Sequence, residues 1–144
     1  MIHEEICTYE VCELAKEKGF NCKVNNYYQA TKHYCETLRG IELHSVLWKL
    51  ETDDCYSRYN KSSEDVVSAP TQSLLQRWLR EEKKYAISVF WDMLSKDYRY
   101  EIVKTIGVLE IQVGEKYNYS NPKGFDTYEL ALEDALKYAL ENLV

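Results

Sequence analysis

Three stretches with a helical repeat of apolar residues, separated by runs rich in β-branched and aromatic residues, constrain this chain more than any other feature. A chain of 144 residues has material for one hydrophobic core of ordinary size. We therefore expect a single α+β domain over residues 1–144. In it, three helices should pack on one face of a small, mainly antiparallel sheet of three to four strands.

The first helical pattern runs from about Thr8 to Lys18. Thr8 is a residue type that caps helix N-termini, and Gly19 stands where a glycine commonly ends a helix. The apolar stripe between them consists of Val11, Leu14 and Ala15. This spacing predicts an amphipathic helix.

The second pattern carries the strongest helix signals and spans about Pro70 to Lys83. Ser68 and Thr71 supply hydroxyls that can cap a helix, a proline suits the first turn, and Ser73 followed by Gln76 has the spacing of a capping box. The apolar residues that share one face are Leu74, Leu75, Trp78 and Leu79. We expect a helix over this whole range.

The third pattern opens at Asp126 and continues nearly to the last residue. Asp126 is expected to cap the helix, with Glu129 at the reciprocal position of a capping box. The apolar residues at helical spacing are Leu132, Leu136, Ala139, Leu140 and Leu143.

The runs between the helical patterns predict strands. Residues 85–91 alternate as a strand packed on one face, and residues 99–105 and 108–113 predict two antiparallel strands joined near Gly107. Residues 21–28 are compatible with a further strand. Together with the helices, these strands predict a core drawn from Val11, Leu14, Leu74, Leu75, Trp78, Leu79, Ile87, Val89, Leu132, Leu136 and Leu140.

The stretch from Phe20 to Glu51 stays ambiguous at its centre. One set of apolar residues fits a helical stripe (Leu43, Val46, Leu47 and Leu50), and another set fits the alternation of a strand (Ile41, Leu43, Ser45 and Leu47). Short apolar runs do not settle this choice. Residues 52–63 and 118–124 have little periodicity and predict surface loops.

Charge and cysteine usage bear on location and partners. A net charge of −6 disfavours non-specific binding to a phosphate backbone. No apolar run approaches the length of a membrane span, and the first five residues lack the features of a signal peptide, so we expect a cytoplasmic protein without a membrane partner. Five cysteines, all in the first half, predict reduced thiols rather than a disulfide framework.

Residue types that could support catalysis or metal binding do not occur at diagnostic spacings. Possible zinc ligands are His3, Cys7, Cys12, Cys22, His33, Cys35 and His44, but no close Cys pair of the usual kind is present. Cys35 beside His33 or His44 has the residue types of a nucleophile and its base, without a family signature. The serine hydrolase motif and glycine-rich phosphate loops are absent. We predict no catalytic residues, no metal site and no cofactor.

Two sets of side chains are candidates for binding a partner. Arg77, Arg80 and Lys84 are spaced to share a flank of the second helix, either as a solvated face or as a contact for an acidic partner. Tyrosine is abundant, and four tyrosines alternate in pairs: Tyr98, Tyr100, Tyr117 and Tyr119. These rings are either half-buried in a sheet or exposed for stacking on a base or a peptide.

Three blocks of the sequence form a recognisable set: Ser68–Thr71 leading into Leu74–Glu81, Thr127–Glu129 leading into Ala135–Tyr138 and Leu140–Leu143, and Glu10–Phe20 with the pattern Glu-Val-x-x-Leu-Ala-Lys-x-Lys-Gly-Phe. They resemble a group of small uncharacterised proteins of gut bacterial genomes and their phages. The resemblance covers about a third of the chain. It implies the three-helix layout and a phage or mobile-element origin, but no activity, and it leaves residues 34–65 without a counterpart.

These observations lead to three hypotheses for function. The first is a non-enzymatic accessory module that binds another protein. The second is a weak nucleic-acid-binding protein that uses the basic helix and exposed tyrosines. The third is an enzyme whose site the sequence does not display.

Overall fold

The computed structural model describes residues 3–52, 64–105, 118–120 and 123–144. Within these ranges the elements are α1 (Tyr9–Glu17), β1 (Asn26–Thr37), β2 (Gly40–Thr52), β3 (Val66–Ser68), α2 (Gln72–Trp78), its π-helical continuation η1 (Leu79–Lys83), β4 (Tyr85–Asp92), β5 (Asp97–Lys104), β6 (Asn118–Ser120) and α3 (Tyr128–Asn142). The predicted α+β class, with three α-helices and antiparallel strands, is confirmed.

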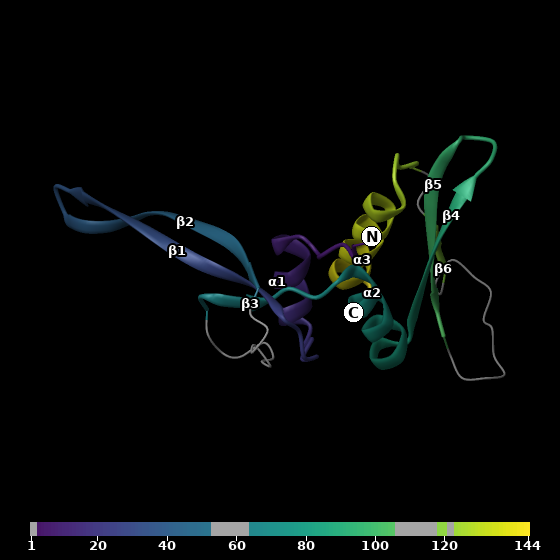
Figure 1. Cartoon of the computed structure of the whole chain (residues 1–144), viewed down its shortest axis with the longest axis horizontal. Coiled ribbons are helices and arrows are strands. Elements are labelled where there is room, and N and C mark those ends of the chain that lie inside the picture. Colours follow the sequence, from purple (N-terminus) through teal and green to yellow (C-terminus); the bar gives the residue numbers. More distant parts are fainter. Residues whose placement is uncertain (1–2, 53–63, 106–117, 121–122) are drawn as a thin grey trace.

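The strands divide between two antiparallel sheets, with the helices between them (Figure 1). One sheet has the order β2–β1–β3, and the other has the order β4–β5–β6. We expected a single sheet. The difference arises because the chain crosses the helical layer through α2 and η1 after β3, so that β4 begins on the other side and cannot hydrogen-bond to β3.

The first helix has almost the predicted extent, but Thr8 does not cap it through its side chain. The Thr8 hydroxyl donates instead to Glu133 Oε1 at 2.7 Å, and the Thr8 N–H reaches the same oxygen at 2.8 Å. Gly19, with a φ of +87°, turns the chain after the helix as predicted. Thr8 therefore connects α1 to α3.

The second helix also has nearly the predicted extent, although it begins at Gln72 and its last turn is π-helical. The predicted capping box of Ser73 and Gln76 is wrong. Thr71, one of the two residues predicted to supply a capping hydroxyl, is the N-cap, because its hydroxyl accepts the N–H of Leu74 at 3.3 Å. The side chain of Gln76 is committed elsewhere, since its amide donates to the backbone carbonyl of Ile87 in β4 at 2.9 Å.

The third helix is capped by Thr127 rather than by Asp126. The Thr127 hydroxyl accepts the N–H of Leu130 at 3.2 Å. The carbonyl of the same threonine accepts the first helical hydrogen bond, from Ala131, which identifies Thr127 as the cap residue. The predicted cap is therefore wrong by one residue.

The hydrophobic core lies where α1, α2 and α3 meet the inner faces of β3, β4 and β5. Most of the predicted core residues are buried, namely Val11, Leu75, Trp78, Leu79, Ile87, Leu132, Leu136 and Leu140. The other three, Leu14, Leu74 and Val89, are partly buried against this cluster. Phe20 joins the core with its ring edge-on to Trp78, at 5.4 Å between centroids. The predicted core is thus largely correct.

The second sheet agrees with the sequence where the structure describes it. Residues 85–91 lie within β4 and residues 99–104 lie within β5, and the two strands pair antiparallel. The predicted strand over 108–113 and most of the predicted loop over 52–63 lie outside the described residues. The predicted loop over 118–124 is wrong for 118–120, because these residues pair with β5 as β6.

The ambiguous segment from Phe20 to Glu51 forms a long β-hairpin. Strand β1 begins at Asn26, later than predicted, and continues to Thr37, and β2 returns antiparallel to it. Figure 1 shows this hairpin projecting away from the helices, with only its base beside them. We call the β1–β2 hairpin the arm.

Candidate binding surfaces

The three basic residues predicted as a contact surface gather around Glu81 in the middle of η1. Arg77 Nε donates to Glu81 Oε1 at 2.8 Å, and Arg80 Nη2 lies 4.0 Å from the same oxygen. Lys84 Nζ donates to the backbone carbonyl oxygen of Glu81 at 2.7 Å. The Glu81 carboxylate raises the pKa of Arg77 and offsets part of the local positive charge. A role of these three residues in binding a partner stays a prediction.

An open groove of about 650 Å³ borders two of these arginines. Lys23, Arg77 and Arg80 line it, together with Glu4 and several amide and hydroxyl groups. Ser73 also lines the groove, and its hydroxyl donates to the Glu4 carboxylate. The lining includes three cations and one carboxylate, and Glu81 offsets part of the charge of Arg77 and Arg80, so the groove keeps a small excess of positive charge that favours anionic groups.

The tyrosines do not form the exposed patch that was one reading of the sequence. Tyr100 is fully buried, because α3 packs over this face of β5, and its hydroxyl donates to Asp134 Oδ2 at 2.7 Å. The Tyr98 ring is partly buried and meets the rings of Trp91 and Tyr128 edge-on. For Tyr119 the structure describes backbone pairing with Ile102, and Tyr117 lies outside the described residues. An exposed role is therefore wrong for Tyr100.

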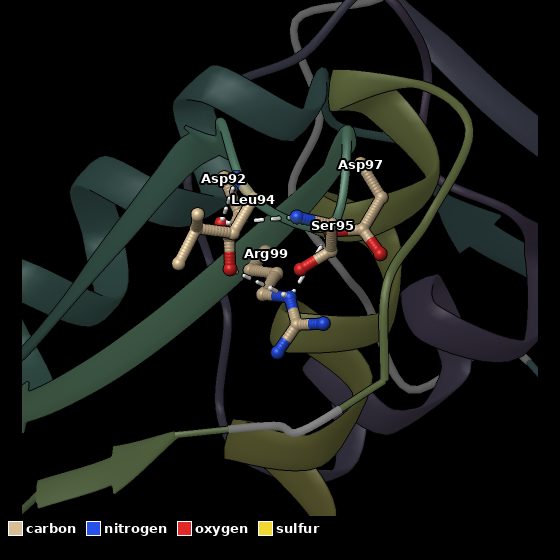
Figure 2. Close-up of polar contacts among 5 residues, drawn as sticks. All are labelled: Asp92, Leu94, Ser95, Asp97 and Arg99. Carbon is tan, nitrogen blue, oxygen red and sulfur yellow. Dashed lines mark hydrogen bonds and ion pairs between the residues drawn. The ribbon is translucent and has the colours of Figure 1, made fainter.

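Polar contacts brace the turn between β4 and β5 (Figure 2). The Asp92 carboxylate accepts the backbone N–H of Leu94 at 2.9 Å and that of Ser95 at 3.4 Å. Arg99 Nε lies 3.3 Å from Asp92 Oδ2 and 3.0 Å from Asp97 Oδ1. The hydrogen bonds from the backbone and from Ser95 lower the pKa of Asp92. The turn is therefore held in a defined conformation.

This braced turn presents a small apolar patch to solvent. The exposed or half-exposed side chains here are Trp91, Met93 and Leu94, and Tyr128 of α3 lies beside them through the contact of its ring with Tyr98. Figure 1 places the turn on the far side of the helices from the arm. The patch at this turn is therefore well separated from the arm.

The arm contains a β-bulge that decides which side chains share a face. His33 pairs with Ser45, but the next residue, Tyr34, pairs with Leu43, so His44 is an extra residue in β2. In strict alternation, odd-numbered and even-numbered residues of a strand lie on opposite faces. The bulge shifts this alternation by one residue.

The consequence is one continuous apolar face. Directly paired residues share a face of the hairpin, so Ile41 and Leu43 lie on the same side as Val46 and Trp48. We call this side the apolar arm face, and its members are Tyr28, Ala30, Lys32, Tyr34 and Glu36 of β1 with Ile41, Leu43, Val46, Trp48 and Leu50 of β2. The opposite side is mainly polar, with Leu47 as its large apolar residue.

The inner end of the apolar arm face packs on α1. Tyr9 stacks on Trp48 with 4.5 Å between ring centroids and meets Tyr28 edge-on at 5.7 Å. The Tyr28 hydroxyl donates to the backbone carbonyl of Cys7 at 2.9 Å, and burial raises the pKa of Tyr28 to about 12. The base of the arm is therefore anchored in the core.

The outer half of the same face is open to solvent. Tyr34 is 60% exposed, Ile41 73%, Leu43 51% and Val46 38%. Exposed apolar patches of this kind commonly mark sites of protein association. A two-stranded hairpin is also marginally stable in water unless another element covers it. These two properties make the arm the strongest candidate for a binding surface.

Among the described residues, four cysteines are free thiols: Cys7 and Cys12 are buried, Cys22 is partly buried and Cys35 is exposed on the polar side of the arm. In the parts of the chain that the structure describes, no three His, Cys, Asp or Glu side chains gather closely enough to hold a metal ion. In the same parts, no helix is long and apolar enough to cross a membrane.

No protein-family model matches the chain, and neither the curated proteins nor the solved structures include a match. The case for function therefore depends on the surfaces described above.

Sequence reasoning did not find the apolar arm face, although a signal for it was present. The apolar residues change from odd numbers (Ile41 and Leu43) to even numbers (Val46, Trp48 and Leu50) on either side of His44. Such a change of phase within one strand is typical of a β-bulge. Without the pairing register, the same residues also fitted a helical stripe.

Proposed function

We propose that this chain is a non-enzymatic protein-binding module that contacts its partner through the apolar arm face. The observation that carries the proposal is the continuity of this face. The face begins at the base of the arm, where Trp48 stacks on Tyr9 of α1, and extends past the bulge at His44 to the exposed pair of Tyr34 and Leu43.

The bulge supports a binding role because the chain's own core does not need it. Core contacts of the arm are made near its base, by Tyr28 and Trp48, and these residues lie before the bulge along the arm. Beyond the bulge, the apolar side chains of this face are exposed to water and do not pack on the core. A partner that covers the face would remove this apolar surface from water and stabilise the hairpin.

A matched pair of variants tests the proposal by affinity capture from extracts of the native host, read out by mass spectrometry. Leu43 and Leu47 lie on the same strand and are similarly exposed, at 51% and 62%, but they face opposite sides of the arm. We expect Leu43→Lys to lose the proteins captured by the unmodified chain and Leu47→Lys to retain them. Capture that is the same for both variants would remove the arm face from the proposal.

A second candidate function is binding of an anionic ligand, including single-stranded nucleic acid, at the groove lined by Lys23, Arg77 and Arg80. The buried position of Tyr100 removes one of the stacking rings that this hypothesis used. An oligonucleotide titration at two salt concentrations tests it. Affinity that falls with added salt, and that Arg80→Glu abolishes, supports this alternative.

Two broader expectations belong to the same proposal. An accessory role in a phage or mobile element is supported by the resemblance of the three sequence blocks. A cytoplasmic location is supported by the free thiols of Cys7, Cys12, Cys22 and Cys35, because disulfides are rare in reducing compartments.

A further inference from the structure

The charges on the apolar arm face are arranged symmetrically around its centre. Lys32 and Glu36 lie two residues to either side of Tyr34 on β1, which places each about 6.6 Å from it along the strand. On β2 the partners of these three residues are all apolar: Val46 beside Lys32, Leu43 beside Tyr34 and Ile41 beside Glu36. The face is therefore complementary in charge to its own reversed copy.

We propose that the occupant of the apolar arm face is the same face of a second copy of this chain, an inference that rests on the proposed function. The two arms pack face to face and run antiparallel, with the two-fold axis at the Tyr34–Leu43 pair. Lys32 of each copy then lies opposite Glu36 of the other, and Ile41 lies opposite Val46. A two-fold interface requires such reciprocal contacts.

The position of α1 fits this arrangement. Leu38 at the tip and Ala30 near the base are both four residues from Tyr34. In the two-fold pair, Leu38 of one copy therefore comes beside Ala30 and Trp48 of the other, where Tyr9 begins to cover the face. The part of the face that Tyr9 leaves open on one copy is thus covered by the same part of the other copy.

The area of the exposed patch is sufficient for a specific dimer of modest affinity. Five large exposed side chains are available on each copy: Tyr34, Ile41, Leu43 and Val46 of the apolar arm face, and Leu38 in the turn at its tip. Each covers on the order of 100 Å² of apolar surface, so two copies bury about 1,000 Å², near the lower limit for specific interfaces. Interfaces of this size belong to weak, transient complexes, so we expect a dimer that dissociates on dilution.

The charge of the arm also permits self-association. Residues 26–52 contain three cations (Lys32, Arg39 and Lys49) and three carboxylates (Glu36, Glu42 and Glu51), so the arm is neutral while the whole chain has a charge of −6. Lys32 Nζ lies 2.8 Å from Asp65 Oδ1 within its own chain. An ammonium group has three donors and can serve a second carboxylate as well.

Sedimentation velocity of the purified full chain over a concentration series, with a reducing agent present because Cys35 is exposed, tests the inference. We expect a monomer–dimer equilibrium that Leu43→Lys abolishes and Leu47→Lys preserves. Circular dichroism of each variant verifies that the fold is retained. A chain that stays monomeric at every concentration overturns the inference, as does a dimer that survives Leu43→Lys.

A charge exchange distinguishes the two-fold geometry from other modes of association. Glu36→Lys leaves two cations on the face, and Lys32→Glu leaves two carboxylates. The homodimer of each variant should therefore have a dissociation constant at least tenfold higher than that of the unmodified chain. An equimolar mixture of the two variants should form a heterodimer, because the charges are again opposite. Failure of the mixture to associate contradicts the antiparallel arrangement.

The outcome for self-association can be separated from that of the proposed function. In one outcome, the purified chain remains monomeric, and capture of host proteins depends on Leu43 but not on Leu47. This outcome rejects the second copy as the occupant of the face and supports the proposed binding module. In the other outcome, the chain forms a dimer that depends on Leu43, but capture of host proteins does not depend on Leu43. This outcome shows that the face binds a second copy of the chain and not another protein.

Discussion

At the scale of single residues, a few polar and ring contacts attach the arm and the second sheet to the helices. Tyr9 stacks on Trp48, and the hydroxyl of Tyr28 donates to the backbone of Cys7. At the other end of the molecule, the hydroxyl of Tyr100 donates to Asp134 in α3. Tyr28 and Tyr100 each pack their ring on apolar neighbours and donate a hydrogen bond through the hydroxyl, whereas Tyr9 and Trp48 contact each other by ring stacking.

The first prediction concerns Tyr28 and alkaline pH. Its pKa is raised to about 12, mainly by burial, so the folded state favours the neutral phenol. The contribution of Tyr28 to the free energy of unfolding should therefore be fully present below the unfolded pKa of about 10. It should be lost as the pH rises from there toward 12. Urea unfolding measured at several pH values checks this.

Tyr28→Phe is the control for this prediction. The variant should be less stable at neutral pH, because the Cys7 carbonyl loses a donor. Its stability should also fall less steeply above pH 10 than that of the unmodified chain. Parallel curves for the two proteins would show that Tyr28 does not contribute to the alkaline loss.

The second prediction concerns Gly124, which touches the β4–β5 turn. A Cβ at this position would lie 1.7 Å from Asp97 Oδ2 and 2.7 Å from Asp97 Cβ. Gly124→Ala should therefore destabilise the fold by about 1–3 kcal/mol and displace Asp97 from Arg99. Thermal unfolding checks this.

A second substitution distinguishes this clash from other effects of alanine. Gly124→Ala combined with Asp97→Ala should recover part of the loss, because the carboxyl group in the way is gone. Strictly additive losses in the double variant would contradict a direct contact between these two positions.

At the scale of elements, the ends of helices and the pairing of strands are set by backbone hydrogen bonds that side-chain patterns indicate only approximately. The third helix starts one residue later than its sequence suggested, because Thr127 and not Asp126 receives the first N–H groups. The arm is likewise shaped by one extra residue, His44, which keeps its apolar side chains on one face.

The third prediction follows from the cap of α3. Thr127→Ala removes the acceptor of the Leu130 N–H and should lower the free energy of unfolding by about 1 kcal/mol. Asp126→Ala is the matched control and should have a smaller effect, since the neighbouring residue occupies the cap position. Chemical denaturation of both variants checks this, and a larger loss for Asp126→Ala would contradict the assignment.

At the scale of the whole molecule, one layer of helices lies between two small sheets, and the arm extends from one of them (Figure 1). The buried side chains come from all three helices and from both sheets. Apolar surface thus remains at the two ends of the molecule, on the arm and on the β4–β5 turn. This distribution is the basis of the proposed binding role.

The fourth prediction concerns the core. Trp78, the last residue of α2, is buried against Phe20, with Lys83 Nζ 5.1 Å from the centroid of its ring. Trp78→Ala should cost about 3–5 kcal/mol, as is typical of aromatic deletions from cores. Trp91→Ala is the control, because Trp91 is 49% exposed and should cost less.

A denaturant titration measures both tryptophan variants. A loss below about 1 kcal/mol for Trp78→Ala would exclude this residue from the core, since a buried ring of that size leaves a large cavity when it is removed.

The sequence by itself determined the fold class, the three helices, the strands β4 and β5 and most of the core, because periodicity and capping residues act over a few neighbouring positions. Only the tertiary structure decided that the strands form two sheets, that Tyr100 is buried under α3, and that Ile41 and Leu43 share a face with Val46. These features depend on hydrogen-bond register and on contacts between distant segments, and local patterns do not encode either of them.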